Sequence, residues 1–301
     1  MLFDKELQKY NLMSYRNEET SILKDVLLDK LNFSVRSLSR MKREKSILVN
    51  GEFEKLNAKL ISGDLIEVKI NEDKANFEPQ DLKLNILFDD FDIIMVDKPP
   101  FMVVHPTKSH VDNTIANGVT HFIDEKDENV KIRFVNRLDM NTSGLVIVAK
   151  NAYAHHVLSD DMKYDKVEKK YITIVKGVVK DDKGVIDVPI YRSNDDTIKR
   201  LVDDRGQHAV THYKVLERLK DATVLEVELF TGRTHQIRVH MEYIGHGIIG
   251  DDLYGYVDES LITRQALHAY SLKFEQPRTR EVLEFESNIP KDMKDLIDKL
   301  K

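Results

Sequence analysis

The residues best suited to chemistry in this sequence lie in a short polar turn between two apolar runs. The turn contains Arg137 and Asp139, and Gly144 precedes an uninterrupted aliphatic run over 145–149. Such a run is typical of a buried strand, so we expect Asp139 to be held at the mouth of a strand, where a carboxylate can act at one fixed position. An aspartate in a turn can equally hydrogen-bond only its own backbone, and the turn alone leaves both interpretations open.

The composition limits the classes of function. The chain has 301 residues, 41% of them hydrophobic, enough for one large domain with a small one or for two medium domains. It has no cysteine, which excludes disulfides, thiolate nucleophiles and cysteine-bound zinc. The N-terminus lacks a signal-peptide pattern, and no apolar run is long enough to cross a membrane. We therefore predict a cytoplasmic protein with no membrane partner.

Two helices followed by short strands predict a small N-terminal unit. Apolar residues at helical spacing predict a helix over 20–31, and Ser34 can cap a second helix that ends near Lys45. Asn50-Gly51 favours a tight hairpin, and 65–70 alternates as a strand. The second helix carries a cluster of positive charges: Arg36, Arg40, Lys42, Arg43 and Lys45. Such a face either binds phosphates or is simply solvated.

The basic helix, the hairpin at Val49-Asn50-Gly51 and the strand that follows Gly63 resemble the alpha-L RNA-binding motif over about residues 21–70. This motif occurs in a small-subunit ribosomal protein and in many RNA-modifying enzymes. The resemblance implies an RNA-binding domain over 1–75, followed by a polar linker over 76–86 and a second domain over 87–301. The net charge of −6 does not favour a polyanion partner. Because each charge reaches only about 8–10 Å at cellular salt, a local basic surface is still compatible with RNA.

The sequence after residue 87 is rich in strands. Apolar or alternating runs predict strands at 91–97, 145–149, 171–175, 185–190, 209–216 and 223–230, and helical spacing predicts helices at 113–122, 151–163 and 235–244. Residues 191–207 are polar and predict a surface excursion. We expect an α+β domain.

Three distant stretches share one pattern, in which a charged side chain follows a strand at a glycine or proline turn. They are KPPFMVVHP at 98–106, NRLDMNTSG at 136–144 and TGRTHQIRVH at 231–240. In this order and spacing they resemble the RluA-type pseudouridine synthases, which isomerise uridine in RNA, and the likeness covers about 87–285. It implies the pseudouridine synthase fold, a mixed and mainly antiparallel sheet flanked by helices, with the active site in a cleft across the sheet.

The resemblance assigns roles residue by residue. The nucleophilic aspartate of the family falls on Asp139, its active-site tyrosine on Tyr171 and its active-site arginine on Arg238. Arg137 matches the arginine that fills the space left by the flipped base. Arg238 can instead pair with Glu242 one turn on, and Tyr171 can be an ordinary strand aromatic. The implied active-site loop contains Arg233 and His235.

The isomerisation implied by the family moves the bond to ribose from a base nitrogen to a base carbon, without redox change, so we expect no cofactor. The carboxylate acts either as a covalent nucleophile or by taking a sugar proton, and the sequence leaves both routes open. We expect no metal site, because the histidines are scattered. Ribosomal RNA is the first expected partner and tRNA the second. We expect the protein to be a monomer.

This sequence departs from the family pattern at three positions. Asn136 stands where the family usually has histidine, Phe101 where it has glycine, and Gly247 where proline is common. Two other functions remain open. A non-catalytic RNA-binding or ribosome-assembly factor needs the basic helix but not the catalytic trio, and a nucleoside glycosidase needs a second carboxylate, which is not evident near Asp139.

Overall fold

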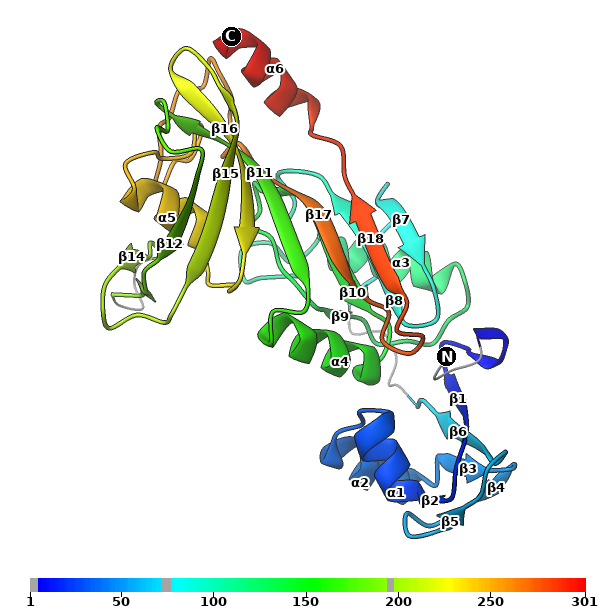
Figure 1. Cartoon of the computed structure of the whole chain (residues 1–301). Helices are drawn as coiled ribbons and strands as arrows, with labels where there is room; N and C mark the ends of the chain where they lie inside the picture. The colour runs from blue at the N-terminus through cyan, green and yellow to red at the C-terminus, as the bar shows by residue number, and fades with distance from the viewer. Residues whose placement is uncertain (1–4, 72–76, 194–197) are drawn as a thin grey trace.

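The computed structural model describes residues 5–71, 77–193 and 198–301, and Figure 1 shows a small N-terminal unit below a larger sheet domain. The elements of the small unit are η1 (Lys5–Leu7), β1 (Leu12–Arg16), β2 (Ser21–Ile22), α1 (Leu23–Asp25), η2 (Val26–Lys30), α2 (Val35–Glu44), β3 (Ile47–Val49), β4 (Glu52–Phe53), β5 (Lys59–Leu60) and β6 (Leu65–Lys69). One sheet has the order β1-β6-β3-β4, and β2 pairs with β5. The predicted boundary at residue 75 lies outside the described residues.

The predicted second helix and hairpin of this unit are confirmed. The Ser34 side chain accepts a hydrogen bond from the Ser37 amide, which caps the start of α2, and Lys45 ends the helix in the left-handed region with φ 51°. Strands β3 and β4 pair across Asn50 and Gly51, whose φ values of 52° and 86° suit a tight turn. The unit closes over its own apolar cluster, which includes residues of α1, η2, α2 and β6.

A ten-stranded sheet forms the larger domain, and its mixed, mainly antiparallel character agrees with the expected α+β class. The strands are β7 (Asn85–Asp89), β8 (Ile93–Lys98), β9 (Arg133–Phe134), β10 (Ser143–Ala149), β11 (Glu168–Lys176), β12 (Lys183–Asp187), β15 (Val210–Arg218), β16 (Ala222–Leu229), β17 (Leu267–Glu275) and β18 (Val282–Glu286). The main order is β12-β15-β16-β11-β17-β10-β8-β7, with β18 beside β17 and β9 beside β10. Strands β13 (Ile190–Tyr191) and β14 (Leu201–Val202) form a separate hairpin, and β7 begins inside the predicted linker.

Two halves of the sheet meet where β10 and β17 pair in parallel, whereas the other pairings between described strands of this sheet are antiparallel. The parallel contact is short, with Ser143 opposite His268 and Gly144 opposite Ala269. Gly144 has φ 115°, and a Cβ at this position would lie 2.1 Å from the Ala269 carbonyl oxygen. Only glycine allows the two backbones to approach this closely.

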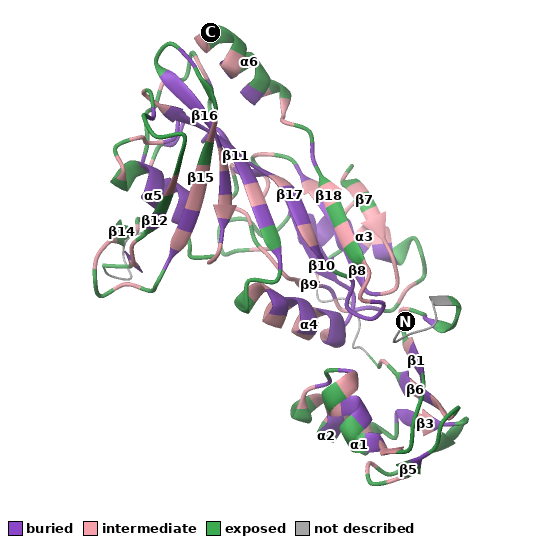
Figure 2. Cartoon of the chain, in the orientation of Figure 1, coloured by how far each residue is buried: buried purple, intermediate pink, exposed green. Residues whose placement is uncertain are grey.

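Helices cover both faces of the sheet. They are α3 (Ile115–Asp124), α4 (Ala152–Lys163), α5 (Gln236–Tyr243) and α6 (Lys291–Leu300). Buried residues, purple in Figure 2, concentrate on the central strands, and β10 is buried at every position as expected for its aliphatic run. Helix α3 shares a core with alternate residues of β8 and β10, and α4 with the intervening ones. Helices α5 and α6 pack in the core of β11 and β16. None of the described helices has the length and apolar character needed to span a membrane.

Helix α4 also lies next to the N-terminal unit, as Figure 1 shows. The rings of Tyr153 and Phe33 lie 4.8 Å apart, and Tyr153 belongs to the apolar cluster of that unit. Arg278, which is fully buried, donates to the carbonyls of Lys9 and Leu12 at 3.0 and 2.9 Å. Its guanidinium pairs with the buried carboxylate of Asp92 at 2.9 Å. These contacts attach the start of the chain to the sheet domain.

Candidate active site

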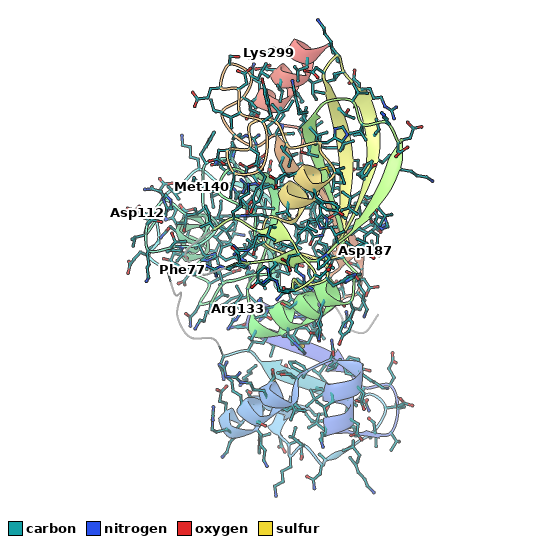
Figure 3. The ribbon with its side chains drawn as sticks, turned by 90° about the vertical axis from the view of Figure 1, so that its left-hand side faces the viewer. Phe77, Asp112, Arg133, Met140, Asp187 and Lys299 are labelled. Carbon is teal, nitrogen blue, oxygen red and sulfur yellow. The ribbon has the colours of Figure 1, made fainter. Side chains whose placement is uncertain are left out.

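Asp139 lies in a tight turn between β9 and β10. The Thr142 amide donates to the Asp139 carbonyl at 3.0 Å, which closes the turn just before the buried strand. Met140, labelled in Figure 3, marks this turn at the level of the sheet and away from the small unit. The Asp139 side chain is 31% exposed. A carboxylate anchored at a strand end yet open to solvent can contact a substrate directly.

Arg238, on the first turn of α5, donates hydrogen bonds to two carboxylates. Its Nη1 donates to Oδ2 of Asp139 at 3.0 Å, while Nε and Nη2 each donate to Asp251 at 2.7 Å. Asp251 is fully buried and also accepts from the amides of Leu253 and Tyr254. The predicted alternative, an Arg238–Glu242 pair, does not form. The Glu242 carboxylate lies instead 3.5 Å from Nζ of Lys199. The bidentate pair with Asp251 fixes the guanidinium in the orientation that meets Asp139.

His235 and Tyr254 complete this side of the site. His235 precedes α5 with φ 59°, and its Nε2 lies 3.8 Å from Oδ2 of Asp139. Its Nδ1 is 2.9 Å from the Tyr254 hydroxyl, and Arg238 lies over the Tyr254 ring. Burial lowers the pKa of His235 from its ordinary value, and the Asp139 charge only partly opposes this. The structure therefore brings Asp139, Arg238 and the predicted loop residue His235 together.

Tyr171 reaches the same place from β11. The β11–β17 register shifts between Lys170 and Tyr171, which places Tyr171 opposite Ala269, the residue that also faces Gly144 across the parallel contact. Such a bulge re-aims a side chain at the sheet surface. Tyr171 is buried, and burial followed by the Asp139 charge raises the pKa of its hydroxyl. The phenol is thus neutral and close enough to sense the Asp139 carboxylate.

Two buried cations hold the Asp139 turn in place. Nζ of Lys98, at the end of β8, donates to the carbonyls of Pro99, Met102 and Met140 at 2.8–2.9 Å and so ties two of the three predicted motifs together. Burial, followed by the nearby Arg264 charge, lowers the pKa of Lys98 to about 7. Arg264 donates to the carbonyl of Asn141 at 3.2 Å.

Arg264 is itself oriented by Asp292 at the start of α6. The Arg264 Nε and Nη2 atoms donate to the Asp292 carboxylate at 2.6 and 3.0 Å. The guanidinium is fully buried. The C-terminal helix thereby contributes to the support of the Asp139 turn, although it lies about 150 positions later in the sequence.

Asn136 has a structural explanation. Its side-chain Nδ2 donates to the carbonyl of Leu145 at 3.0 Å, and its Oδ1 accepts from the Ile147 amide at 2.8 Å. The amide thus acts as a backbone mimic that pairs with β10 on both its donor and its acceptor sides. An asparagine at this position braces the Asp139 turn against the buried strand.

The remaining predicted residues of the site lie at its rim. Arg137 and Arg233 are exposed. Arg233 donates through Nε to the His208 carbonyl at 2.9 Å. Within the described ranges, no hydrogen bond or ion pair of the Arg137 side chain is seen. Its charge does reach His105, whose pKa is lowered first by burial and then by Arg137.

The predicted RNA-binding cations of α2 lie far from this site, on the N-terminal unit. Arg36, Lys42, Arg43 and Lys45 are exposed, as a phosphate-binding face requires. Arg40 is only half-exposed, and its Nε donates to Glu44 at 2.8 Å. The cluster is therefore not uniform, because Arg40 is already engaged within its own helix.

The structure also shows the surroundings of Phe101 and Gly247, the other two positions that depart from the family pattern. Phe101 adopts φ 63°, a backbone conformation that suits glycine, and its side chain is 56% exposed. Gly247 lies in close backbone packing, since an added Cβ would meet Gly255 Cα at 2.9 Å. Phe101 therefore accepts a strained backbone and presents an aromatic ring to solvent within the first motif.

Several supporting residues were not among those predicted. The resemblance to the family extends to Gly250-Asp251 and Tyr254-Gly255, which was the available signal for Asp251 and Tyr254. Lys98 precedes the proline pair of the first motif. Arg264 carries no local signal. No group of three or more histidine or carboxylate side chains in the described parts of the chain could hold a metal ion.

Comparison with known proteins agrees with this geometry. Residues 92–243 match the family model described as RNA pseudouridylate synthase. An uncharacterised RNA pseudouridine synthase of Bacillus subtilis, YlyB, is 43% identical over 265 residues, which cover 86% of this chain and 87% of that relative. The ribosomal large subunit pseudouridine synthase D of Vibrio cholerae is 39% identical over 306 residues, 93% of this chain and 94% of its own.

A solved structure is also similar. Human RNA pseudouridylate synthase domain containing 1 is 26% identical, with a TM-score of 0.57, and the match covers 70% of this chain and 86% of the human one. Another, human RNA pseudouridylate synthase domain containing 4, shares the fold at 23% identity and a TM-score of 0.59. The expected family and fold are both confirmed, and the chain belongs to the RluA-type RNA pseudouridine synthases, a family of isomerases.

Proposed function

We propose that this enzyme isomerises a uridine of large-subunit ribosomal RNA, with Asp139 as the group that attacks the nucleotide. The observation that carries the proposal is the Asp139–Arg238–Asp251 arrangement, in which a solvent-accessible carboxylate has a fixed, permanently charged partner. The relatives named as ribosomal large subunit pseudouridine synthase D support the choice of RNA.

Asp139, Tyr171 and Arg137 each have a separate role in the proposed reaction. The Asp139 carboxylate either bonds to the ribose at carbon 1′ or takes a sugar proton to form a glycal, and in both routes the bond from ribose to base nitrogen breaks. The base turns, its carbon 5 bonds to carbon 1′, and the proton on carbon 5 leaves. Tyr171, neutral and buried, forms the floor on which the base stacks. Arg137, exposed beside Asp139, enters the stack in place of the flipped nucleotide.

Loss of the proton on carbon 5 gives a direct assay. The purified protein is incubated with unmodified large-subunit ribosomal RNA and tRNA transcripts that carry tritium at carbon 5 of uridine. We expect tritium release from ribosomal RNA, and sequencing of the product then identifies the modified position. Binding of the RNA without any release of tritium would contradict the proposal.

Asp139→Asn is the matched inactive variant, because it keeps the shape of the side chain and removes its charge. We expect release to fall by a factor of about 10⁴ or more, as for other enzymes that lose the attacking group, while RNA binding is retained. Activity close to that of the unaltered protein would remove Asp139 from the mechanism.

The N-terminal unit is proposed as a second RNA contact. Its exposed α2 cations face solvent, and helix α4 contacts both this unit and the sheet that carries Asp139. A basic face held in this way can bind phosphates of structured RNA while the target uridine occupies the active site.

A further inference from the structure

His235 occupies an unusual position for the residue that precedes a helix. Side chains at this position commonly cap the first amides, but the imidazole makes no such bond to α5, and the backbone of His235 adopts φ 59°. A left-handed backbone is unfavourable for a histidine, and strain of this kind is found mainly at functional sites. The imidazole lies instead between two side chains, with Nε2 at 3.8 Å from Oδ2 of Asp139 and Nδ1 at 2.9 Å from the Tyr254 hydroxyl.

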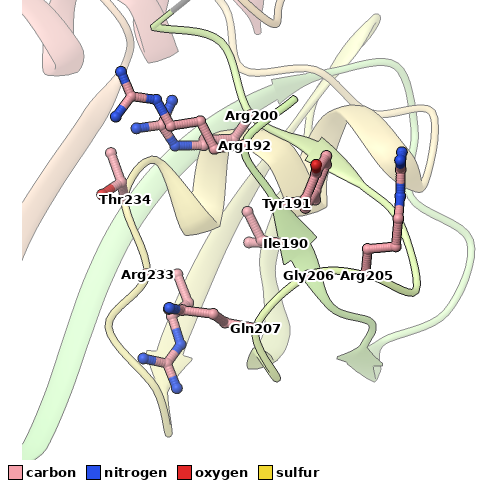
Figure 4. A pocket seen from close by; sticks show the side chains of 9 residues that line it. All are labelled: Ile190, Tyr191, Arg192, Arg200, Arg205, Gly206, Gln207, Arg233 and Thr234. Atoms are coloured by element: carbon pink, nitrogen blue, oxygen red, sulfur yellow. The ribbon is translucent and has the colours of Figure 1, made fainter. Parts of the chain in front are cut away.

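The oxygen of the Tyr254 hydroxyl already accepts one hydrogen bond, from the Arg200 amide at 2.6 Å. Arg200 lies just before β14 and lines a cavity of about 400 Å³ together with Thr234, the residue before His235, as Figure 4 shows. The Arg200 guanidinium donates to the Ile198 carbonyl at 2.8 Å, so the segment that presents this amide is held by its own side chain. Because an amide N–H can only donate, the hydroxyl proton of Tyr254 is left for another acceptor.

These contacts determine which imidazole nitrogen carries the proton. Within the described residues, Nδ1 of His235 is the one acceptor in contact with the Tyr254 hydroxyl, so the hydroxyl donates to Nδ1 and the neutral ring holds its proton on Nε2. The other tautomer would leave the hydroxyl proton without an acceptor and would place the Nε2 lone pair against the Asp139 carboxylate. Burial lowers the pKa of His235, which favours the neutral ring. An N–H group therefore faces Asp139.

The two oxygens of the Asp139 carboxylate have different surroundings. Nη1 of Arg238 donates to Oδ2 at 3.0 Å, and Nε2 of His235 faces the same oxygen. Oδ1 accepts no hydrogen bond from any residue in the described parts of the chain. The 3.8 Å between Nε2 and Oδ2 is too long for a hydrogen bond, but catalytic hydrogen bonds are often long before the substrate binds and shorten in the complex. Two donors beside Oδ2 leave Oδ1 as the oxygen that can reach the nucleotide.

We propose that His235, held by Tyr254 in its Nε2–H tautomer, is a positioning residue that keeps Oδ1 of Asp139 directed at the ribose. The inference rests on the proposed function, because it names the reacting oxygen of the proposed attacking group. His235 acts on Asp139 and not on the RNA, so its loss should lower kcat and leave KM nearly unchanged. The Tyr254 hydroxyl acts one step further away, through the imidazole.

The tautomer can be measured at pH 7.5 without any substrate. In protein labelled with ¹⁵N-histidine, protonated and bare ring nitrogens have well-separated chemical shifts, and His235→Gln identifies the signals of this ring among the 11 histidines. We expect a proton on Nε2 and none on Nδ1. Tyr254→Phe, which keeps the ring that lies beside Arg238, should give a mixture of the two tautomers. A proton on Nδ1 of His235 in the unaltered protein would overturn the proposal.

Kinetics test whether the donor at Nε2 matters. The amide of glutamine reaches about as far as Nε2, whereas that of asparagine reaches only about as far as Nδ1. With tritium release as the readout, we expect kcat to fall about 100-fold in His235→Asn with KM within about twofold of normal, and about tenfold or less in His235→Gln. His156→Gln makes the same kind of change on α4 and should leave both constants unchanged.

A double-mutant cycle shows whether Tyr254 acts through His235. Tyr254→Phe alone should lower kcat about tenfold and should have no added effect in the His235→Asn background. Fully additive effects, equal kcat in His235→Asn and His156→Gln, or a rise in KM at constant kcat would each overturn the proposal. Absence of tritium release by the unaltered protein would instead refute the proposed function, while the nitrogen shifts would still decide the tautomer. Thermal unfolding of each variant checks that a lost contact is not a lost fold.

Discussion

The positive charges inside the sheet domain and those on α2 differ in almost every physical respect. Arg238, Arg264 and Lys98 are buried, and each has hydrogen-bond acceptors fixed around it. Arg36 and Arg43 on α2 face solvent. A buried cation is tolerated only with its partners in place, so it determines geometry, whereas an exposed one contributes affinity that salt screens. The same residue types thus position the Asp139 turn in one region and, on the function proposed above, offer a contact for RNA in the other.

Among the buried cations, substitution of Arg238 should have the largest effect on stability and activity. Arg238→Met leaves the buried Asp251 carboxylate without its cation, and we expect a loss of about 3–5 kcal/mol in unfolding free energy together with loss of tritium release. Chemical denaturation measures the loss in unfolding free energy. The double variant Arg238→Met/Asp251→Asn should regain much of the stability and none of the activity. Recovery of activity in that variant would show that Arg238 serves folding alone.

Lys98→Met removes the link between the first motif and the Asp139 turn while keeping the volume of the side chain. Three carbonyls lose their donor, and we expect about 1–3 kcal/mol of destabilisation. Looser positioning of Asp139 should lower kcat about 10- to 100-fold with little change in KM. A rise in KM at constant kcat would point to substrate binding rather than positioning.

Low pH should also reduce the stability of the folded protein, through its buried histidines. Burial lowers the pKa of five histidines: His105, His155, His235, His240 and His268. Because each binds its proton more weakly in the folded than in the unfolded chain, stability is fully present above the unfolded value of about 6.5 and falls as pH drops below it. Asp90, whose pKa burial raises to about 6, acts in the opposite direction. We expect a lower Tm at pH 5.5 than at pH 7.5, and an equal or higher Tm would contradict this.

The fully buried His240 gives a site-specific check of this pH effect. Its ring pairs with the Thr211 hydroxyl at 2.9 Å and with the Val188 carbonyl at 3.1 Å. His240→Gln keeps hydrogen-bonding groups and removes the titration, so the fall in Tm between the two pH values should become smaller. An unchanged fall would exclude His240 as a contributor.

Neutralising the exposed cations of α2 should leave the stability of the protein unchanged. The triple variant Arg36→Gln/Lys42→Gln/Arg43→Gln keeps α2 and its cap, and surface substitutions of this kind change unfolding free energy by about 0.5 kcal/mol or less each. If α2 binds RNA, affinity should fall by about tenfold or more at low salt and the difference should shrink as salt rises. Equal affinity at every salt concentration would assign α2 to the solvated surface.

The smallest expected effect is at Phe101. Phe101→Gly relieves a left-handed backbone that costs about 1–2 kcal/mol, while the flexibility of glycine in the unfolded chain takes back about 0.5–1 kcal/mol. We therefore expect a change of less than about 1 kcal/mol, in the stabilising direction. A marked loss of RNA affinity without a change in stability would give the exposed ring a role in binding.

Much of this fold follows from local patterns. The α2 cap, the Asn50-Gly51 hairpin and the aliphatic strand 145–149 each depend on neighbouring residues, and all three are confirmed. Strands β1, β17 and β18 and helix α6 are not among the predicted elements. Strand β17 buries polar residues such as His268 and Ser271 in its central position, so it lacks an apolar run.

The candidate site, like the fold, could be predicted from the sequence only in part. The family motifs indicated Asp139, Tyr171, Arg238 and His235, and the structure brings them together. Their supports depend on pairings between residues far apart in sequence, such as Arg264 with Asp292. Ion pairs of this kind leave no spacing pattern in one sequence, because either partner alone looks like an ordinary charged residue.

The short parallel contact at Gly144 has a consequence for how this enzyme acquires activity. Asp139 belongs to one side of that contact, and Tyr171 and Arg238 belong to the other. Each side is built largely from antiparallel neighbours, whereas the contact itself joins residues 125 positions apart. Loops of that length close late in folding. We expect refolding chains to regain most of their secondary structure before any catalysis, with activity appearing only when the two sides join.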